Sequence, residues 1–217
     1  MSKAVVFDMD GILFDTESLF IKCWVKLADE FKLKDIESAL KECIGTNEEK
    51  TKEILKSHYG ESFDLAYYHK KVRALFQEHI TTYGMPMKVG VHELLEYLKE
   101  EGYKIGLASS TRVESVKSEL KSAGIEHYFE VIIGGDMVKE SKPKPEIYLL
   151  ACQELGVNPK ETIAIEDSLN GIRAAHAAGM KPIMVPDLIQ PTKEIEVMLY
   201  QKFDSLIDVR DFLIKQV

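Results

Sequence analysis

The sequence predicts an α/β protein in which a doubly wound parallel sheet is interrupted by an inserted all-helical domain. Three observations lead to this prediction: short apolar runs alternate with helical patterns, glycines follow the helical stretches, and one long segment has no strand pattern. Apolar runs that lack alternating polar residues are typical of strands buried on both faces of a parallel sheet.

Five apolar runs are the expected strands. They are AVVF at 4–7, YKIGLA at 103–108, VIIG at 131–134, TIAI at 162–165 and PIMV at 182–185. Helical patterns separate most of them, at 91–100, 113–122, 146–155 and 169–178. This alternation predicts a Rossmann-like core with helices packed on the sheet.

Glycine and proline mark the ends of these helical stretches. Gly102, Gly124, Gly156 and Gly179 each follow one, where a left-handed C-terminal cap is needed. Pro145 stands near the start of another helix, where the missing N–H costs nothing.

One segment breaks the alternation, because residues 16 to 83 show only helical patterns. These patterns lie near 16–31, 35–43, 47–58 and 64–83. A crossover between parallel strands needs only about a dozen residues, so we expect a small helical cap domain inserted after the first strand. The predicted division is a core of residues 1–15 and 86–217 and a cap of residues 16–85, with linkers at 14–17 and 84–89.

Composition excludes several classes of protein. The 217-residue chain has a net charge of −8 and no basic block, which argues against a nucleic-acid partner. No run reaches the ~18 apolar residues of a membrane span, and Asp8 interrupts the N-terminal apolar stretch too early for a signal peptide. Three scattered cysteines support neither disulfides nor a zinc site. We therefore expect a cytoplasmic protein, a monomer, without membrane or nucleic-acid contacts.

Polar residues gather just past the expected strand ends, where ligands bind in open α/β sheets. They are Asp8 and Asp10 after the first strand, Ser109, Ser110 and Thr111 after the second, Lys142 and Lys144 after the third, and Glu166 and Asp167 at the fourth. Mg²⁺ takes hard oxygen ligands, usually carboxylates together with water and a substrate phosphate. Lysine and hydroxyl groups bind the remaining phosphate oxygens. These residue types therefore predict a site for Mg²⁺ and a phosphate group.

Each piece has an ordinary structural interpretation when it is taken alone. The DxDG string is also found in turns, although Ile12 excludes an EF-hand loop. Serines such as Ser109 commonly cap helices, Lys142 could be a solvated surface lysine, and Glu166–Asp167 could cap the helix that follows. The occurrence of all four in order, each at a strand end, favours a functional site.

The strings DMDGILFDTE, LASSTR, SKPKPEIY and IEDSLNGIRAA resemble the four motifs of the haloacid dehalogenase (HAD) superfamily, in its β-phosphoglucomutase-like phosphatase branch. The resemblance covers essentially the whole chain, including the helical cap. It implies an Mg²⁺-dependent phosphatase that hydrolyses a small phosphorylated metabolite, such as a sugar phosphate, through an aspartyl-phosphate.

The same resemblance implies the roles of the site residues. Asp8 is the nucleophile and Asp10 the general acid and base. Ser109, Ser110 and Lys142 bind the phosphoryl group. The metal is held by the Asp8 carboxylate, the Asp10 main-chain carbonyl and Asp167, with Glu166 in support.

Two rival functions remain open. One is a β-phosphoglucomutase, an isomerase with the same chemistry, whose cap carries a histidine and a Lys-Gly…Arg loop. At the corresponding cap positions, which we expect to govern substrate specificity, this chain has Phe20, Ile44, Gly45 and Glu48 or Glu49, which weakens that reading. The other is a non-enzymatic phospho-accepting module, although such modules lack the cap and the second aspartate.

Overall fold

The structure is a computed structural model that describes residues 3–43 and 48–216, and the side chain of Glu48 is also outside the description. The chain forms two compact units, one of Met1–Asp15 with Met87–Val217 and one of Thr16–Pro86. The boundary lies one residue beyond the predicted end of the cap at residue 85. The two units are described separately below.

The first unit is built on a parallel sheet of six strands in the order β3-β2-β1-β4-β5-β6. The strands are β1 (Ala4–Phe7), β2 (Lys104–Ala108), β3 (Val131–Ile133), β4 (Thr162–Glu166), β5 (Lys181–Met184) and β6 (Gln201–Lys202). The predicted fold class is confirmed. β1 lies centrally between β2 and β4, and all four of its residues are buried, as its unbroken apolar sequence requires.

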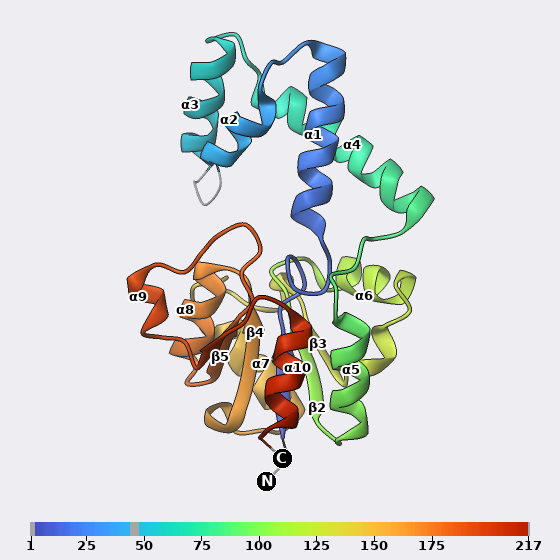
Figure 1. Cartoon of the computed structure of the whole chain (residues 1–217), viewed down its shortest axis with the longest axis vertical. Helices are drawn as coiled ribbons and strands as arrows, with labels where there is room; N and C mark the ends of the chain where they lie inside the picture. Colours follow the sequence, from blue (N-terminus) through green and yellow to red (C-terminus); the bar gives the residue numbers. More distant parts are fainter. Residues whose placement is uncertain (1–2, 44–47, 217) are drawn as a thin grey trace. The chain divides into compact units, whose positions relative to one another are not determined.

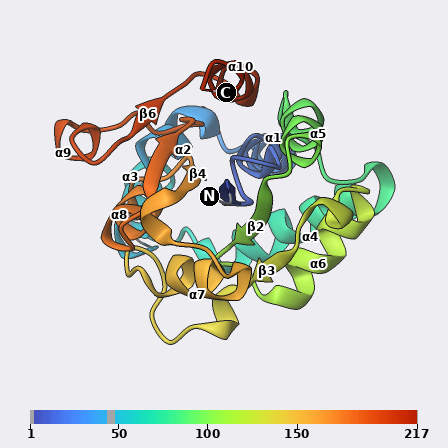
Figure 2. The same cartoon turned by 90° about the horizontal axis from the view of Figure 1, so that it is seen from below.

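Helices cover both faces of this sheet. They are α5 (Val91–Glu100), α6 (Val113–Ser122), α7 (Glu146–Leu155), α8 (Leu169–Ala177), α9 (Lys193–Glu196) and α10 (Leu206–Ile214), with short 3₁₀ turns η1 (Glu126–Tyr128), η2 (Gly135–Met137) and η3 (Pro159–Glu161). Figure 2 shows α5, α6 and α10 on one side of the sheet and α7 and α8 on the other. Side chains of α7 and α8 form a continuous core with Val6, Ala108 and Ala164 of the strands.

The glycines that follow the helices adopt the predicted conformation. Gly102, Gly124, Gly156 and Gly179 have φ values of 69°, 72°, 64° and 78°, in the left-handed region that residues with a Cβ avoid. The sequence analysis predicts no helix or strand after residue 185. In this part of the chain the structure has α9, β6 and α10.

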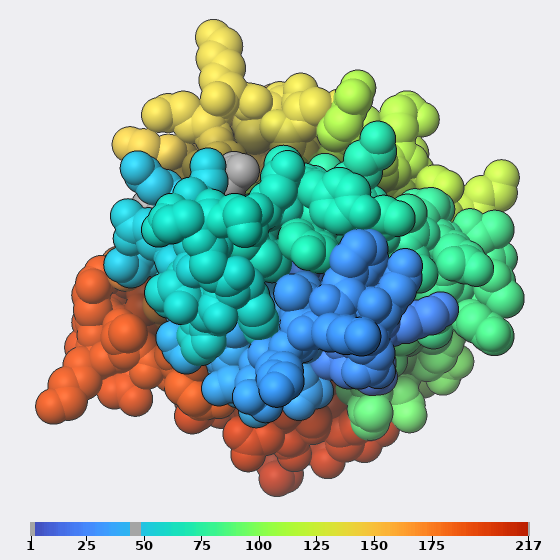
Figure 3. All heavy atoms as spheres, turned by 90° about the horizontal axis from the view of Figure 1, so that it is seen from above, coloured from blue at the N-terminus to red at the C-terminus, as the bar shows by residue number. Residues whose placement is uncertain are grey.

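The second unit consists of the helices α1 (Thr16–Phe31), α2 (Ile36–Cys43), α3 (Glu48–Tyr59) and α4 (Leu65–Tyr83) (Figure 1). Its core is centred on Trp24, Leu27, Leu55 and Val72, each at most 1% exposed. In the space-filling view of Figure 3, the blue to teal atoms of this unit form one closely packed surface.

The chain leaves and re-enters the sheet unit at neighbouring points. Phe14 forms an antiparallel bridge with Met87, and the backbone N–H of Lys88 donates to the carbonyl of Leu13 at 2.9 Å. The Lys88 ammonium also lies 2.7 Å from a carboxylate oxygen of Asp187, in the loop after β5. The predicted first linker, 14–17, is wrong in its second half, because α1 already begins at Thr16.

Among the described residues, no helix is both long enough and apolar enough to cross a membrane.

Candidate active site

Asp8 lies at the carboxyl end of β1, in the middle of the sheet. Its backbone N–H donates to Ile165 of β4 at 2.9 Å, which fixes the main chain, and the residue is only 8% exposed. The turn that follows places Gly11 at φ +77° directly against Asp167. A Cβ on Gly11 would overlap the Asp167 carboxylate, so glycine is required for the two acidic loops to approach each other.

Lys142 joins the carboxyl ends of three strands. Its ammonium donates to a carboxylate oxygen of Asp8 at 2.6 Å and to one of Glu166 at 2.6 Å. A third hydrogen bond, of 3.0 Å, goes to the carbonyl of Ala108 at the end of β2. The side chain is 7% exposed, so this is a buried, fully oriented cation and not a solvated surface lysine.

Glu166 is completely buried and held on both carboxylate oxygens. Oε1 accepts from Lys142 and, at 2.7 Å, from the Tyr148 hydroxyl, while Oε2 accepts from the Ser168 hydroxyl at 3.0 Å. Gly171 of α8 packs so closely that a Cβ there would overlap this carboxyl group. A buried carboxylate that accepts this many hydrogen bonds fixes the positions of the side chains that donate to it.

Ser109, Ser110 and Thr111 form a loop at the end of β2. Ser109 is fully buried, and its hydroxyl accepts from the Thr111 backbone N–H at 3.1 Å. The Thr111 hydroxyl donates to the Asp10 carboxylate at 3.4 Å, and Ser110 lies exposed on the same loop. Residues from the first two strand ends are therefore connected through Thr111.

Tyr148, Thr111 and Ser168 are missing from the site residues predicted from the sequence. Thr111 follows the second expected strand and Tyr148 is the last residue of the string SKPKPEIY, but no spacing rule connects Tyr148 to Glu166. Ser168 is readable as an N-cap, and it does accept from the Gly171 N–H at 3.0 Å. Its second bond, to Glu166, depends on tertiary structure.

The electrostatics of the site are set by two buried carboxylates that share one ammonium group. Burial, followed by repulsion from Glu166, raises the pKa of Asp8 to about 7, although Lys142 opposes the shift. Burial alone would lower the pKa of Lys142, but Asp8 and Glu166 outweigh it and raise that pKa above its usual value. The site thus retains uncompensated negative charge, which an added cation would stabilise.

Asp8, Glu166 and Asp167 fit a metal ion. Each offers one carboxylate oxygen, and these atoms all lie within 4.8 Å of one another. An all-oxygen set of this kind suits a hard divalent cation better than a soft one. A bound cation would lower the raised pKa of Asp8, because it would add positive charge beside a carboxylate whose ionised form is disfavoured by burial and by Glu166.

The predicted specificity residues belong to the helical unit, where the structure describes the side chains of Phe20 and of Glu49, which is exposed. Phe20 of α1 packs edge-to-face against the rings of His69 and Phe76, with centroids 6.2 and 6.3 Å apart. Ile44 and Gly45 and the side chain of Glu48 lie outside the described residues. Their expected role in specificity therefore stays a prediction.

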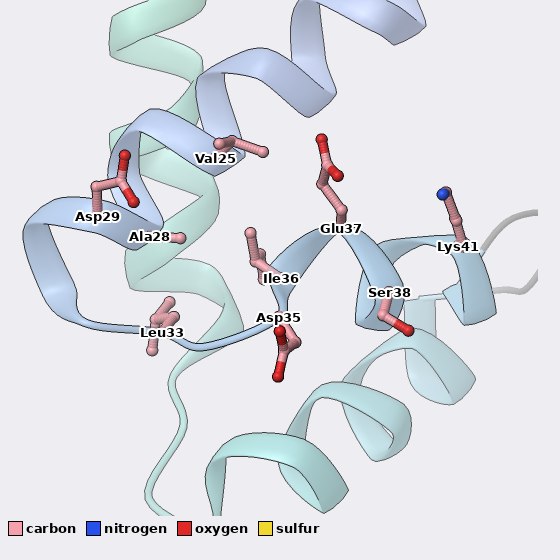
Figure 4. Close-up of a pocket in the computed structure, with 9 residues that line it drawn as sticks. All are labelled: Val25, Ala28, Asp29, Leu33, Asp35, Ile36, Glu37, Ser38 and Lys41. Carbon is pink, nitrogen blue, oxygen red and sulfur yellow. The ribbon is translucent and has the colours of Figure 1, made fainter.

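A hollow in the helical unit is formed by the end of α1 and the start of α2 (Figure 4). The hollow is lined by the apolar residues Val25 and Ile36 and by the acidic residues Asp29, Asp35 and Glu37, among others. None of the residues predicted for the phosphate site lines it.

Buried carboxylates that could hold a cation lie here next to a fixed ammonium and hydroxyls at the carboxyl ends of parallel strands, and these are the groups expected of a metal- and phosphate-binding site in an α/β enzyme. The comparisons with known proteins agree with this class. A model of the family described as "Haloacid dehalogenase-like hydrolase" matches residues 5–185. The chain belongs to this family.

Two curated relatives and one solved structure illustrate the similarity. The chain is 34% identical over 181 residues to the phosphorylated carbohydrates phosphatase of Thermotoga maritima, with 83% of each chain covered. It is 35% identical to the candidate phosphatase YhcW of Bacillus subtilis, covering 96% of this chain and 92% of the relative. A crystal structure of a candidate β-phosphoglucomutase from Thermotoga maritima superposes with a TM-score of 0.82, 29% identity and full coverage of both chains. The predicted enzyme class, a phosphoric monoester hydrolase, is confirmed.

Proposed function

We propose that the protein is an Mg²⁺-dependent phosphatase that hydrolyses a small phosphomonoester, a sugar phosphate or a similar metabolite, through an aspartyl-phosphate on Asp8. The observation that carries the proposal is the 2.6 Å contact between the Lys142 ammonium and Asp8 in a buried site. The Thermotoga maritima relative named for phosphorylated carbohydrates supports this class of substrate.

In the first step, a carboxylate oxygen of Asp8 attacks the phosphorus atom while the bond to the ester oxygen breaks. Carboxylate and phosphate are both anionic, so their approach needs positive charge nearby, which Lys142 supplies at Asp8. Ser109 would bind another phosphate oxygen from the neighbouring strand end. The covalent intermediate divides one difficult hydrolysis into two easier transfers.

Asp10 would move the protons in both steps. It gives a proton to the departing alcohol and later takes one from the water that attacks the phosphorus of the aspartyl-phosphate. It stands two residues from Asp8, so it shares the site without occupying the in-line position. The Thr111 hydroxyl, which donates to Asp10, orients its carboxyl group.

Asp8, Asp167 and the main-chain carbonyl of Asp10 would hold the Mg²⁺, with Glu166 in support. When bound, the ion supplies positive charge that stabilises the phosphate oxygens as charge develops. Glu166 is already bonded to Lys142, Tyr148 and Ser168, so its main contribution is to keep Lys142 in place.

The test is phosphate release from a panel of metabolite phosphates with Mg²⁺, for the wild type and for Asp8→Asn. The amide cannot act as the nucleophile, so we expect turnover to fall by at least ~10³-fold while the circular dichroism spectrum is unchanged. Asp204→Asn, at an exposed position of the sheet unit, is the matched control and should keep wild-type turnover. Activity of Asp8→Asn within tenfold of wild type would contradict the mechanism.

The second candidate is a β-phosphoglucomutase, which the similarity to the Thermotoga maritima structure favours. Phe20 opposes it, because a phenyl ring neither donates nor accepts the proton of a sugar hydroxyl. A coupled assay for glucose 6-phosphate, run on β-glucose 1-phosphate beside a phosphate-release assay, decides between the two. Isomerisation faster than release would establish the mutase.

A further inference from the structure

The segment from Gly134 to Glu146 joins β3 to α7 and carries Lys142. Two carboxylates of this segment accept hydrogen bonds from backbone N–H groups that are distant from them in the sequence. Asp136 accepts from Val113, and Glu146 accepts from Lys139 and Glu140. We propose that Asp136 and Glu146 are positioning residues, which fix the loop of Ser109–Thr111 and the ammonium of Lys142 in their phosphate-binding arrangement. This inference rests on the proposed function.

Asp136 caps helix α6 from a different part of the chain. The N-cap residue of α6 is Arg112, whose side chain makes no capping bond. Instead, the Asp136 carboxylate accepts from the N–H of Val113, the first helical residue, at 2.8 Å. This bond holds the position where the Ser109–Thr111 loop passes into the helix, and a carboxylate there also meets the positive end of the helix dipole.

Two glycines allow this contact by bringing backbone against backbone. The N–H of Gly135 donates to the carbonyl of Thr111 at 2.9 Å. A Cβ at Gly134 would overlap the backbone of Val113, and a Cβ at Gly135 would overlap the carbonyl of Ser110. The backbone of Ser110–Val113 is therefore supported by the backbone of these two glycines.

Glu146 accepts hydrogen bonds from the middle of the segment and so holds the part that carries Lys142 in a closed loop. A single carboxylate oxygen of Glu146 accepts from the N–H of Lys139 at 3.1 Å and from that of Glu140 at 2.9 Å. Lys142 lies inside the loop that these bonds close, two residues after Glu140. These hydrogen bonds also hold the pKa of the Glu146 carboxyl group below its usual value, so the acceptor stays ionised at neutral pH.

Loss of either carboxylate should move a phosphate-binding group and leave the sheet intact. None of the hydrogen bonds of Asp136 and Glu146 described above involves Asp8 or Glu166. A displacement of about 1 Å in a binding group can lower the rate by as much as ~10²-fold.

The experiment compares Asp136→Ala and Glu146→Ala with Asp136→Asn and Glu146→Gln, which keep an acceptor oxygen but lose the charge. The measurements are kcat and KM for the best substrate, the inhibition constant of orthophosphate with Mg²⁺, and the melting temperature. We expect each alanine variant to raise KM and the orthophosphate constant by about tenfold or more. The amide variants should restore both values to within about threefold of wild type.

The matched control is Glu140→Ala, which removes an exposed carboxylate from the same segment and keeps the backbone N–H that Glu146 binds. It should have wild-type constants. Where Glu146→Ala does not fold, Glu146→Asp replaces it, because the shorter side chain keeps the charge but cannot reach both N–H groups.

A purely structural role would lower kcat through a smaller active fraction and leave KM and the orthophosphate constant unchanged, since neither depends on that fraction. That result in both alanine variants would overturn the inference. A wild-type protein that releases no phosphate from any substrate would instead overturn the proposed function.

Discussion

Lys142 decides the charge balance of the site, because its single ammonium group lies between two buried carboxylates at equal distances of 2.6 Å. The place of this lysine, in the segment between the third strand and the following helix, was predictable from the sequence. Its burial was not, since a lysine that precedes a proline in SKPKP is compatible with a surface turn. Only the tertiary structure shows that Tyr148 and Glu166 surround it.

The raised pKa of Asp8 predicts how stability depends on pH in the absence of metal. The folded state binds this proton up to a pH of about 7, whereas the unfolded chain releases it near the ordinary value of 3.8. Between these values the folded state holds more protons, so its stability falls as pH rises. In EDTA, we therefore expect the melting temperature of Asp8→Asn to exceed that of wild type increasingly from pH 4 to pH 7.

Thermal melts of both proteins across this range check the prediction, with Asp204→Asn as the control at an exposed position. A difference between Asp8→Asn and wild type that does not change with pH would show that the Asp8 carboxylate is not destabilised by burial.

Helices and strands up to residue 185 follow the sequence closely, because buried parallel strands and capped helices have strong local signals. The predicted strand at 4–7 and the helices at 91–100, 113–122 and 146–155 have the observed bounds. β6 was missed because its two residues, Gln201 and Lys202, are polar and exposed. α10 has the apolar spacing of an amphipathic helix at Leu206, Val209 and Leu213, all of them buried, and this spacing is a signal from which the helix could have been predicted.

Gly171→Ala in α8 should destabilise the sheet unit. Alanine favours a helix over glycine by up to ~1 kcal/mol, but its Cβ would overlap the buried Glu166 carboxyl group. Overpacking of a core costs typically ~1–3 kcal/mol, and here the displaced group is a fixed carboxylate. We expect a net loss of unfolding free energy, measured in urea.

The control for this substitution is Asn170→Ala at the neighbouring, exposed position of the same helix, which should change stability by less than ~0.5 kcal/mol. An unchanged or raised urea midpoint for Gly171→Ala would mean that Glu166 can move away without cost.

The molecule as a whole consists of two units, and each carries a buried cysteine: Cys23 in the helical unit and Cys152 in the sheet unit. Burial raises the pKa of both thiols, that of Cys152 to about 11. Labelling by a thiol reagent should therefore need local or global unfolding. Mass spectrometry of digested protein would follow the two sites separately. We expect Cys23 to react first, because the helical unit has the smaller core, and equal rates would indicate a single cooperative unfolding unit.

Activity of the whole enzyme should need Mg²⁺, be lost in EDTA and be inhibited by Ca²⁺. Ca²⁺ takes more ligands at longer distances, so it would disturb the octahedral arrangement that Mg²⁺ prefers and with it the in-line alignment of the reacting groups. Phosphate release in each metal, with Mg²⁺ restored after EDTA as the control, measures this. Full activity in Ca²⁺ or in EDTA would refute the magnesium proposal.

The bridge between Phe14 and Met87 has an evolutionary consequence. Because the two ends of the helical insertion are already held together by the sheet unit, the core loses little loop-closure entropy when the inserted segment changes in length or sequence. Lys88 holds this junction to the core by its ion pair with Asp187 and its backbone hydrogen bond to Leu13. Neither interaction involves a residue of the insertion. Changes in the length or sequence of residues 16–86 should therefore be tolerated in evolution with little loss of stability in the sheet unit.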